Sequence, residues 1–199
     1  MNLKKLFIRS QNLLINPATE FEAIALEKPS LPAVTRDYTI PVSVIVALFA
    51  LIGAAFSNIT LPVNAFLYVV INSIIVFLLI LTHTYISGKA ITLLGKNIHA
   101  GDSPSGYYAL SAYAQLPFFL VLALVKLLPS LIFLVVLGFY SAVLFNTGSS
   151  VMTAVPRAKR LQFTLLSVLI MITSFIICSE LYTLLYAEII EQFSTFVVF

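Results

Sequence analysis

The sequence predicts an all-α integral membrane protein with five transmembrane helices and a short N-terminal amphipathic interfacial helical region. Of its 199 residues 60% are apolar, and the mean hydropathy is +1.05. Only 10% are charged, whereas a soluble domain carries about 25%. Long runs of the chain also contain no charged residue, and about 20 such residues suffice to cross a bilayer as a helix. Together these observations exclude a soluble globular domain, a disordered chain and a coiled coil.

The first element, residues 1–37, is predicted to be an amphipathic helical region on the cytoplasmic surface, separate from a transmembrane domain over residues 38–199. Its apolar side chains recur at helical spacing: Leu3, Leu6, Phe7, Leu13 and Leu14. Lys4, Lys5 and Arg9 lie on the opposite face, and a basic amphipathic helix of this kind favours anionic lipid headgroups. Asn16-Pro17 then begins a second short helix, because Pro suits the first helical position.

The spans follow from the uncharged runs and the turn-forming residues between them. No charged residue occurs from Tyr38 to Gly88, and this run is too long for one helix, so we place a break at residues 57–62. The polar stretch at residues 87–106 is interpreted as a loop, and Pro129 is expected to open span four. The predicted spans cover about 38–57, 63–86, 106–127, 129–153 and 161–185.

The basic residues predict the orientation of these spans. Ten Lys and Arg residues fall in the N-terminal region and in the loops after spans two and four, which all lie on one side of the membrane. Lys126 is alone on the other side. Because cytoplasmic loops carry the excess of basic residues, the N-terminus should be cytoplasmic and the C-terminus should lie on the opposite side.

No catalytic constellation is evident, so we expect no enzyme activity, no cofactor and no metal site. The motifs of metalloproteases, serine hydrolases, P-loops and dinucleotide-binding folds are absent from the sequence. Cys178 is the only cysteine. The only histidines are His83 and His99, which we interpret as an interfacial residue near the cytoplasmic end of span two and a loop residue.

The polar residues within the spans are the remaining candidates for a site, since such residues are costly in a bilayer. Asn72 and Gln115 are expected to hydrogen-bond across helices. Lys126 and Glu180 fall at similar depth near the outer interface, where they either pair between spans three and five or snorkel separately to the headgroups. The Gly53-x-x-x-Ser57 spacing would let a second helix approach closely, in this chain or in another copy.

Pro117 is expected to deform span three. Proline cannot donate to the helical ladder, and it clashes with the carbonyl four residues earlier, which is that of Tyr113. Gln115 or a neighbouring helix would then supply a donor for that carbonyl. The deformation is either a packing kink or a kink that opens a polar groove between spans.

The order of several motifs around the spans resembles the Yip family, whose members are named for interacting with Ypt/Rab GTPases. The residues that carry the resemblance are Gly88, Gly95-Lys96, Tyr113-Ala114-Gln115-Leu116-Pro117, Pro129, Gly138-Phe139-Tyr140, Gly148 and Val155-Pro156 with Lys159. Asp37-Tyr38-Thr39-Ile40-Pro41 is loosely similar to the element that precedes the first span in that family.

The resemblance implies a non-enzymatic protein with five spans and a cytoplasmic N-terminus. Eukaryotic members act in vesicle traffic and membrane shaping, through small GTPases and one another. This chain is more similar to the compact prokaryotic members, which implies the bacterial plasma membrane. The leading hypothesis is therefore a scaffold that organises the bilayer or recruits a homo-oligomeric or membrane-protein partner. The alternative is a small oligomeric transporter or channel that uses polar groups between spans three and five.

Overall fold

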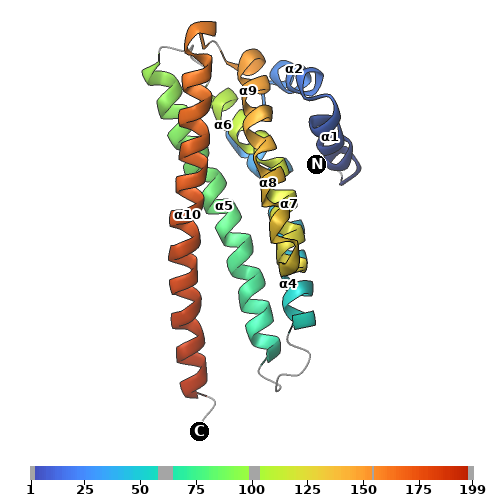
Figure 1. Cartoon of the computed structure of the whole chain (residues 1–199), viewed down its shortest axis with the longest axis vertical. Coiled ribbons are helices and arrows are strands. Elements are labelled where there is room, and N and C mark those ends of the chain that lie inside the picture. Colours follow the sequence, from blue (N-terminus) through green and yellow to red (C-terminus); the bar gives the residue numbers. More distant parts are fainter. Residues whose placement is uncertain (1–2, 58–64, 99–103, 154, 197–199) are drawn as a thin grey trace.

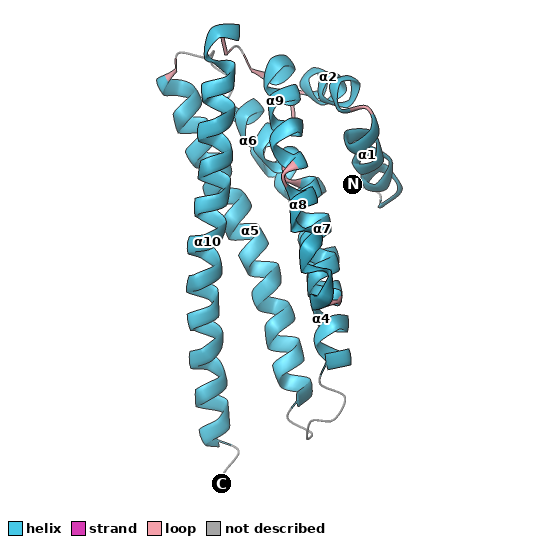
Figure 2. Cartoon of the chain, viewed as in Figure 1, coloured by secondary structure: helices cyan, strands magenta, loops and turns pink. Residues whose placement is uncertain are grey.

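The computed structural model describes residues 3–57, 65–98, 104–153 and 155–196. These residues form an elongated bundle of helices, and no strand occurs in these four ranges (Figure 2). Five helical stretches are long and apolar enough to cross a membrane, which confirms the predicted fold class: Leu31–Ser57, Phe66–Asn97, Ser105–Leu127, Pro129–Met152 and Arg157–Glu191. The expected break at residues 58–62 and the expected loop residue His99 lie outside the described residues.

Two short helices, α1 (Leu3–Ile15) and α2 (Pro17–Glu27), lie at one end of the bundle, and the C-terminus lies at the other (Figure 1). Proline opens α2 as expected. Lys28 ends it in the left-handed conformation (φ 45°). The chain turns sharply there, so that α2 packs against α9 (Tyr140–Met152).

The first crossing begins before residue 38, where the sequence had placed the boundary of the transmembrane domain. α3 (Leu31–Val34), a π-helical turn η1 (Thr35–Thr39) and α4 (Ile40–Ser57) follow one another without interruption. Ser30 caps this stretch, because its hydroxyl accepts a hydrogen bond from the N–H of Ala33 at 3.4 Å. The N-terminal region is therefore continuous with the first crossing.

The loop expected from residue 87 is wrong over its first half, because α5 (Ala65–Asn97) continues through it. Gly88 and Gly95 lie against α6 (Pro104–Ala114), and Cβ atoms at these positions would lie 2.5 Å and 2.7 Å from the rings of Tyr108 and Tyr107. The glycines thus serve close helix packing, which outweighs their low helix propensity. The last helix, α10 (Arg157–Phe196), likewise extends beyond both ends of its predicted span.

The third crossing occupies the centre of the bundle. It consists of α6 and α7 (Leu116–Leu127), and 72% of its most apolar window is buried, against 22–39% for the other four crossings. Pro129 opens the fourth crossing as predicted, in a 3₁₀ turn η2 (Pro129–Leu134) that leads through α8 (Val135–Gly138) into α9. α4 packs on α5 and α7, whereas α10 packs on α5 and α9.

Candidate functional site

The break in the third crossing positions the polar residues of the site. α6 ends at Ala114, Gln115 forms a turn, and Pro117 lies in the first turn of α7, so the expected deformation is present. Gln115 does not supply the donor expected for the carbonyl of Tyr113; its amide nitrogen donates instead to the carbonyl of Ser111 at 3.0 Å. The residues around the break take part in two separate buried clusters, one through Gln115 and the other through Tyr113.

The first cluster joins three crossings around His83 of α5. Its Nε2 shares a hydrogen bond with Oε1 of Gln115, and its Nδ1 lies 3.1 Å from the hydroxyl of Ser174 in α10. The amide nitrogen of Gln115 also donates to the hydroxyls of Ser87 and Ser111, at 3.3 Å and 3.2 Å. His83 and Gln115 are 1% and 2% exposed. Gln115 therefore bonds across helices as expected.

α5 does not end just after His83, as the expected boundary of span two at residue 86 implied; the interfacial position of His83 stays a prediction. The helix continues to Asn97, which places about 21 Å of helix beyond His83 at 1.5 Å per residue. Asn72, the other expected bridging residue, is half-buried, and no hydrogen bond of its side chain is found among the described residues. The position of a residue along its predicted span did not show which polar residue of α5 faces Gln115.

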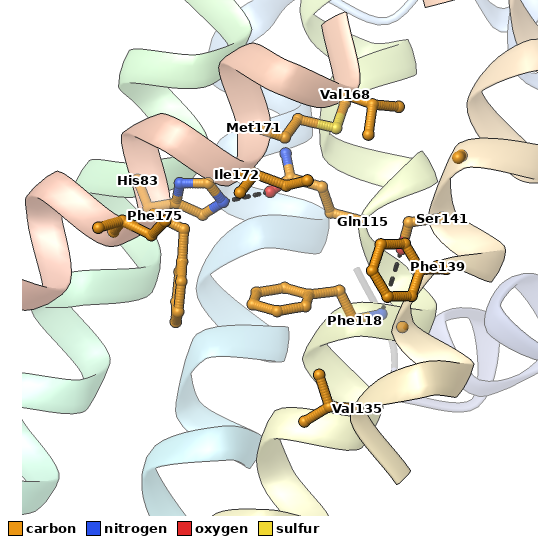
Figure 3. A pocket seen from close by; sticks show the side chains of 13 residues that line it. His83, Gln115, Phe118, Val135, Phe139, Ser141, Val168, Met171, Ile172 and Phe175 are labelled. Atoms are coloured by element: carbon orange, nitrogen blue, oxygen red, sulfur yellow. Dashed lines mark hydrogen bonds between the residues drawn. The ribbon is translucent and has the colours of Figure 1, made fainter. Parts of the chain in front are cut away.

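A pocket of about 220 Å³ adjoins this cluster between α7, α8, α9 and α10 (Figure 3). His83 and Gln115 lie at one side of it, and Ser141 lies at the other, where its hydroxyl accepts a hydrogen bond from the N–H of Phe118 at 3.3 Å. The ring of Phe175 meets that of His83 edge-on at 5.4 Å. The other lining side chains are apolar, so the kink opens onto an apolar pocket with a polar edge.

The polar groups beside this pocket hold helices together. Both ring nitrogens of His83 are engaged in hydrogen bonds, and no carboxylate lines the pocket. The described part of the chain contains no group of three His, Cys, Asp or Glu residues that could hold a metal ion. The cluster fixes α5, α6 and α10 to one another.

The second cluster holds the N-terminal helices on the bundle through Arg9. Its guanidinium donates to Glu20 at 3.0 Å, to Glu27 at 2.6 Å and to the hydroxyl of Tyr113 at 3.3 Å. The guanidinium carbon also lies 5.6 Å from the centre of the Tyr113 ring. Arg9 is 7% exposed, so its predicted position facing the headgroups is wrong. It faces α2 and the third crossing.

The hydrogen bonds of this cluster favour the charged forms of Arg9 and Glu27. Burial works against the charged guanidinium, but its hydrogen bonds to Glu27 and Tyr113 outweigh that cost and raise the pKa of Arg9 above its ordinary value. The hydrogen bond from Arg9 in turn lowers the pKa of Glu27, against a smaller opposing effect of burial. Asn12 donates to the second oxygen of Glu20 at 2.9 Å, which completes the coordination of that buried carboxylate.

Two tyrosines among the predicted site residues, Tyr113 and Tyr140, help to hold the N-terminal helices on the bundle. The ring of Tyr113 lies 4.3 Å from that of Tyr38, so the Arg9 cluster also reaches the first crossing. Tyr140 of α9 donates to the carbonyl of Leu14 in α1 at 3.3 Å. The cluster itself was not predicted from the sequence, although Glu20 and Glu27, seven residues apart on one face of a helix, were a signal for it.

Of the two alternatives for Lys126 and Glu180, the ion pair is not formed, and separate snorkelling to the headgroups stays a prediction. Lys126 lies in the last turn of α7, which packs on α4, whereas Glu180 is exposed on α10, which packs on α5 and α9. A Cβ at Gly53 would collide with the carbonyl oxygen of Lys126, so the small-residue spacing in α4 serves contact with α7 of the same chain. Two residues predicted at similar depth in the membrane are therefore not neighbours here. The ion pair that motivated the transporter hypothesis is not formed.

The comparison with protein families gives one match. The family model described as the Yip1 domain matches residues 12–178, which include the break in the third crossing and the whole His83 cluster. No curated protein and no solved structure matches the chain.

Proposed function

Because the chain belongs to the Yip family, we propose that it is a non-enzymatic membrane scaffold that organises one leaflet of the bilayer through its docked N-terminal helices. In this proposal α1 and α2 lie in the headgroup region of the cytoplasmic leaflet of a bacterial plasma membrane. The bilayer, with its anionic headgroups, is the first partner. A second copy or another membrane protein is the next, and a small GTPase remains an expectation of the family resemblance alone.

One observation carries the proposal: the N-terminal helices are anchored on their inner side and apolar on their outer side. Arg9 holds them to the bundle. Ile8, Ile15 and Leu26 are nevertheless 46%, 64% and 84% exposed. Apolar side chains of interfacial helices are buried at the boundary between headgroups and acyl chains, at about 25 cal/mol for each Å² removed from water.

The position of α1 and α2 gives this contact a mechanical consequence. They widen the molecule at one end only, beside α9, whereas the other end consists of the crossings alone (Figure 1). A rigid body that occupies more area in one leaflet than in the other favours curvature toward the narrower leaflet. We therefore expect the protein to reduce the size of the vesicles that contain it.

The charge distribution supports the cytoplasmic assignment of that end. α5 ends there, with Lys96 in its last turn. α10 begins there, with Arg157, Lys159 and Arg160 in its first turn. Lys4 and Lys5 are exposed on α1 at the same end. This clustering agrees with the positive-inside rule.

The test is reconstitution of the full chain into vesicles of phosphatidylcholine and phosphatidylglycerol, with diameters measured by electron cryomicroscopy. The Ile8→Asn/Ile15→Asn variant removes the apolar outer face without touching the groove under α1, whereas Ile8→Leu/Ile15→Leu preserves it as a matched control. We expect smaller vesicles with the wild type and the control than with the Asn variant, at equal incorporation measured by flotation. Equal diameters for all three proteins would contradict the proposed function.

A further inference from the structure

We propose that the groove between α1 and the bundle is a binding site for one anionic phospholipid, with an acyl chain lying beneath α1. The proposal rests on the interfacial position of α1 in the proposed function. It goes beyond that function by assigning a discrete lipid to a defined site.

The groove is formed by three elements. One face of α1 forms its roof, and the first half of α4 and most of α7 form its floor. The volume of this open groove is about 670 Å³, within the range of about 300–1,000 Å³ that is typical of ligand sites. The residues that carry the argument are Phe7, Ser10, Gln11 and Leu14 on α1, Ile45 on α4 and Leu120 on α7.

The Arg9 cluster explains why this space exists. Arg9 holds one side of α1 against α2 and Tyr113, while Phe7, Gln11 and Leu14 face the groove at helical spacing. The anchored side fixes the distance between α1 and the crossings beneath it. The side chains on the other face do not fill that distance.

The lining indicates an apolar occupant. Ser10 and Gln11 are the polar residues among those that line the groove, and a stable buried water needs two to four polar partners. An empty apolar space would forfeit the dispersion contacts of its walls. Ile45 and Leu120 are 37% and 41% exposed on membrane-crossing helices, so the groove opens toward the bilayer, where acyl chains are the available apolar material.

The charge of α1 indicates an anionic headgroup. The helix carries Lys4 and Lys5 and no acidic residue. Lys4 is exposed one turn before Phe7, and Lys5 lies 3.7 Å from Glu27 of α2. A headgroup at this end would meet positive charge, and the hydroxyl of Ser10 and the amide of Gln11 could donate to its phosphate or ester oxygens.

The experiment is photo-crosslinking of the full chain in phosphatidylcholine nanodiscs that contain traces of a phosphatidylglycerol with a diazirine on its acyl chain. Adducts are mapped by mass spectrometry. We expect them to concentrate on residues 6–14, 42–46 and 116–123, and to fall several-fold when the probe is a phosphatidylcholine. Equal labelling by the two probes would overturn the anionic site.

A matched pair of variants tests the groove itself. Ile45→Trp fills it, whereas Ile52→Trp makes the same change two turns further along α4 at a residue of similar exposure, 42%, that does not line it. We expect several-fold fewer groove adducts with the first variant and no change with the second. A second pair, Leu120→Trp and Leu124→Trp on α7, covers the case in which the first variant fails to fold.

The outcomes separate this site from the proposed function. Adducts spread evenly over all lipid-facing helices, and unchanged by Ile45→Trp, would show annular lipid only and overturn the site. Crosslinks that place a second copy of the chain in the groove would overturn it as well. Groove adducts in a protein that leaves vesicle diameter unchanged would support the site and contradict only the proposed function.

Discussion

Arg9 connects three parts of the chain, and its partners differ in how much they depend on it. Glu20 is buried with it, whereas the side chain of Glu27 is 41% exposed. Removing one member of a buried ion pair leaves an uncompensated charge, which is the costly case; replacing both members costs much less. The energetics of docking α1 therefore depend on the pair of Arg9 with Glu20.

We predict that Arg9→Met lowers the free energy of unfolding by about 3 kcal/mol because it leaves Glu20 buried and unpaired. The double variant Arg9→Met/Glu20→Gln should recover part of that loss. Thermal unfolding of the purified protein in detergent measures both. A double variant no more stable than Arg9→Met would contradict the pairing.

The second prediction at this scale concerns pH. The hydrogen bond from Arg9 lowers the pKa of Glu27 below its ordinary value of 4.5. Its stabilising contribution is therefore complete above pH 4.5 and is lost as the pH falls through the lower value of the folded protein. Because Glu27 is partly exposed, solvent screening limits the contribution to less than about 1 kcal/mol.

Unfolding measured at neutral pH and below pH 4.5 should show a smaller pH dependence for Glu27→Gln than for the wild type. Glu22→Gln, which changes an exposed glutamate of the same helix, is the control and should retain the full dependence. Identical pH profiles for Glu27→Gln and the wild type would argue against the assignment.

At the scale of the elements, glycines allow the helices to approach closely. Gly53 lies against the backbone of Lys126 and Leu127, which cannot move away as a side chain could. Gly138, by contrast, has room: a Cβ there would lie 3.5 Å from the ring of Phe118, an ordinary contact. The two positions differ in packing but not in secondary structure, since both are helical.

We predict that Gly53→Ala destabilises the protein by about 1–3 kcal/mol through overpacking. Gly138→Ala should be neutral or slightly stabilising, because alanine has the higher helix propensity. Thermal unfolding in the same detergent compares them. Equal effects of the two substitutions would show that α4 and α7 are not in close contact.

The elements also show what the sequence could predict. Uncharged runs located the crossings, and proline chemistry located the starts of α2 and the fourth crossing and the break at Pro117. The C-terminal end of α5 was missed because Gly88 and Gly95 suit a loop locally, and only the rings of Tyr107 and Tyr108 show why they are helical. The partners of His83 and Arg9 were missed because pairing depends on the arrangement of helices around the bundle, which spacing along one helix does not give.

At the scale of the whole molecule, that arrangement separates residues that share a depth. α10 contacts the third crossing through Phe175 and Phe163, which meet Phe118 and Tyr107. Lys126 lies near the end of α7 against α4, so Lys126 and Glu180 belong to different parts of the bundle. Sites without shared partners normally contribute independently.

We therefore predict that the effects of Lys126→Leu and Glu180→Leu on stability are additive to within about 0.5 kcal/mol. Thermal unfolding of the two single variants and the double variant tests this. A double variant more stable than the sum by more than about 1 kcal/mol would restore the ion pair that the structure lacks.

We conclude that α1 and α2 form one folded unit with the membrane-crossing bundle. Hydrogen exchange of the full chain in nanodiscs, read by mass spectrometry, tests it most directly. Amides in α1 and α2 should exchange slowly in the wild type and quickly in Arg9→Met, while α5, α6 and α7 stay protected in both. Rapid exchange throughout residues 3–27 of the wild type would show a free N-terminal arm and contradict the account.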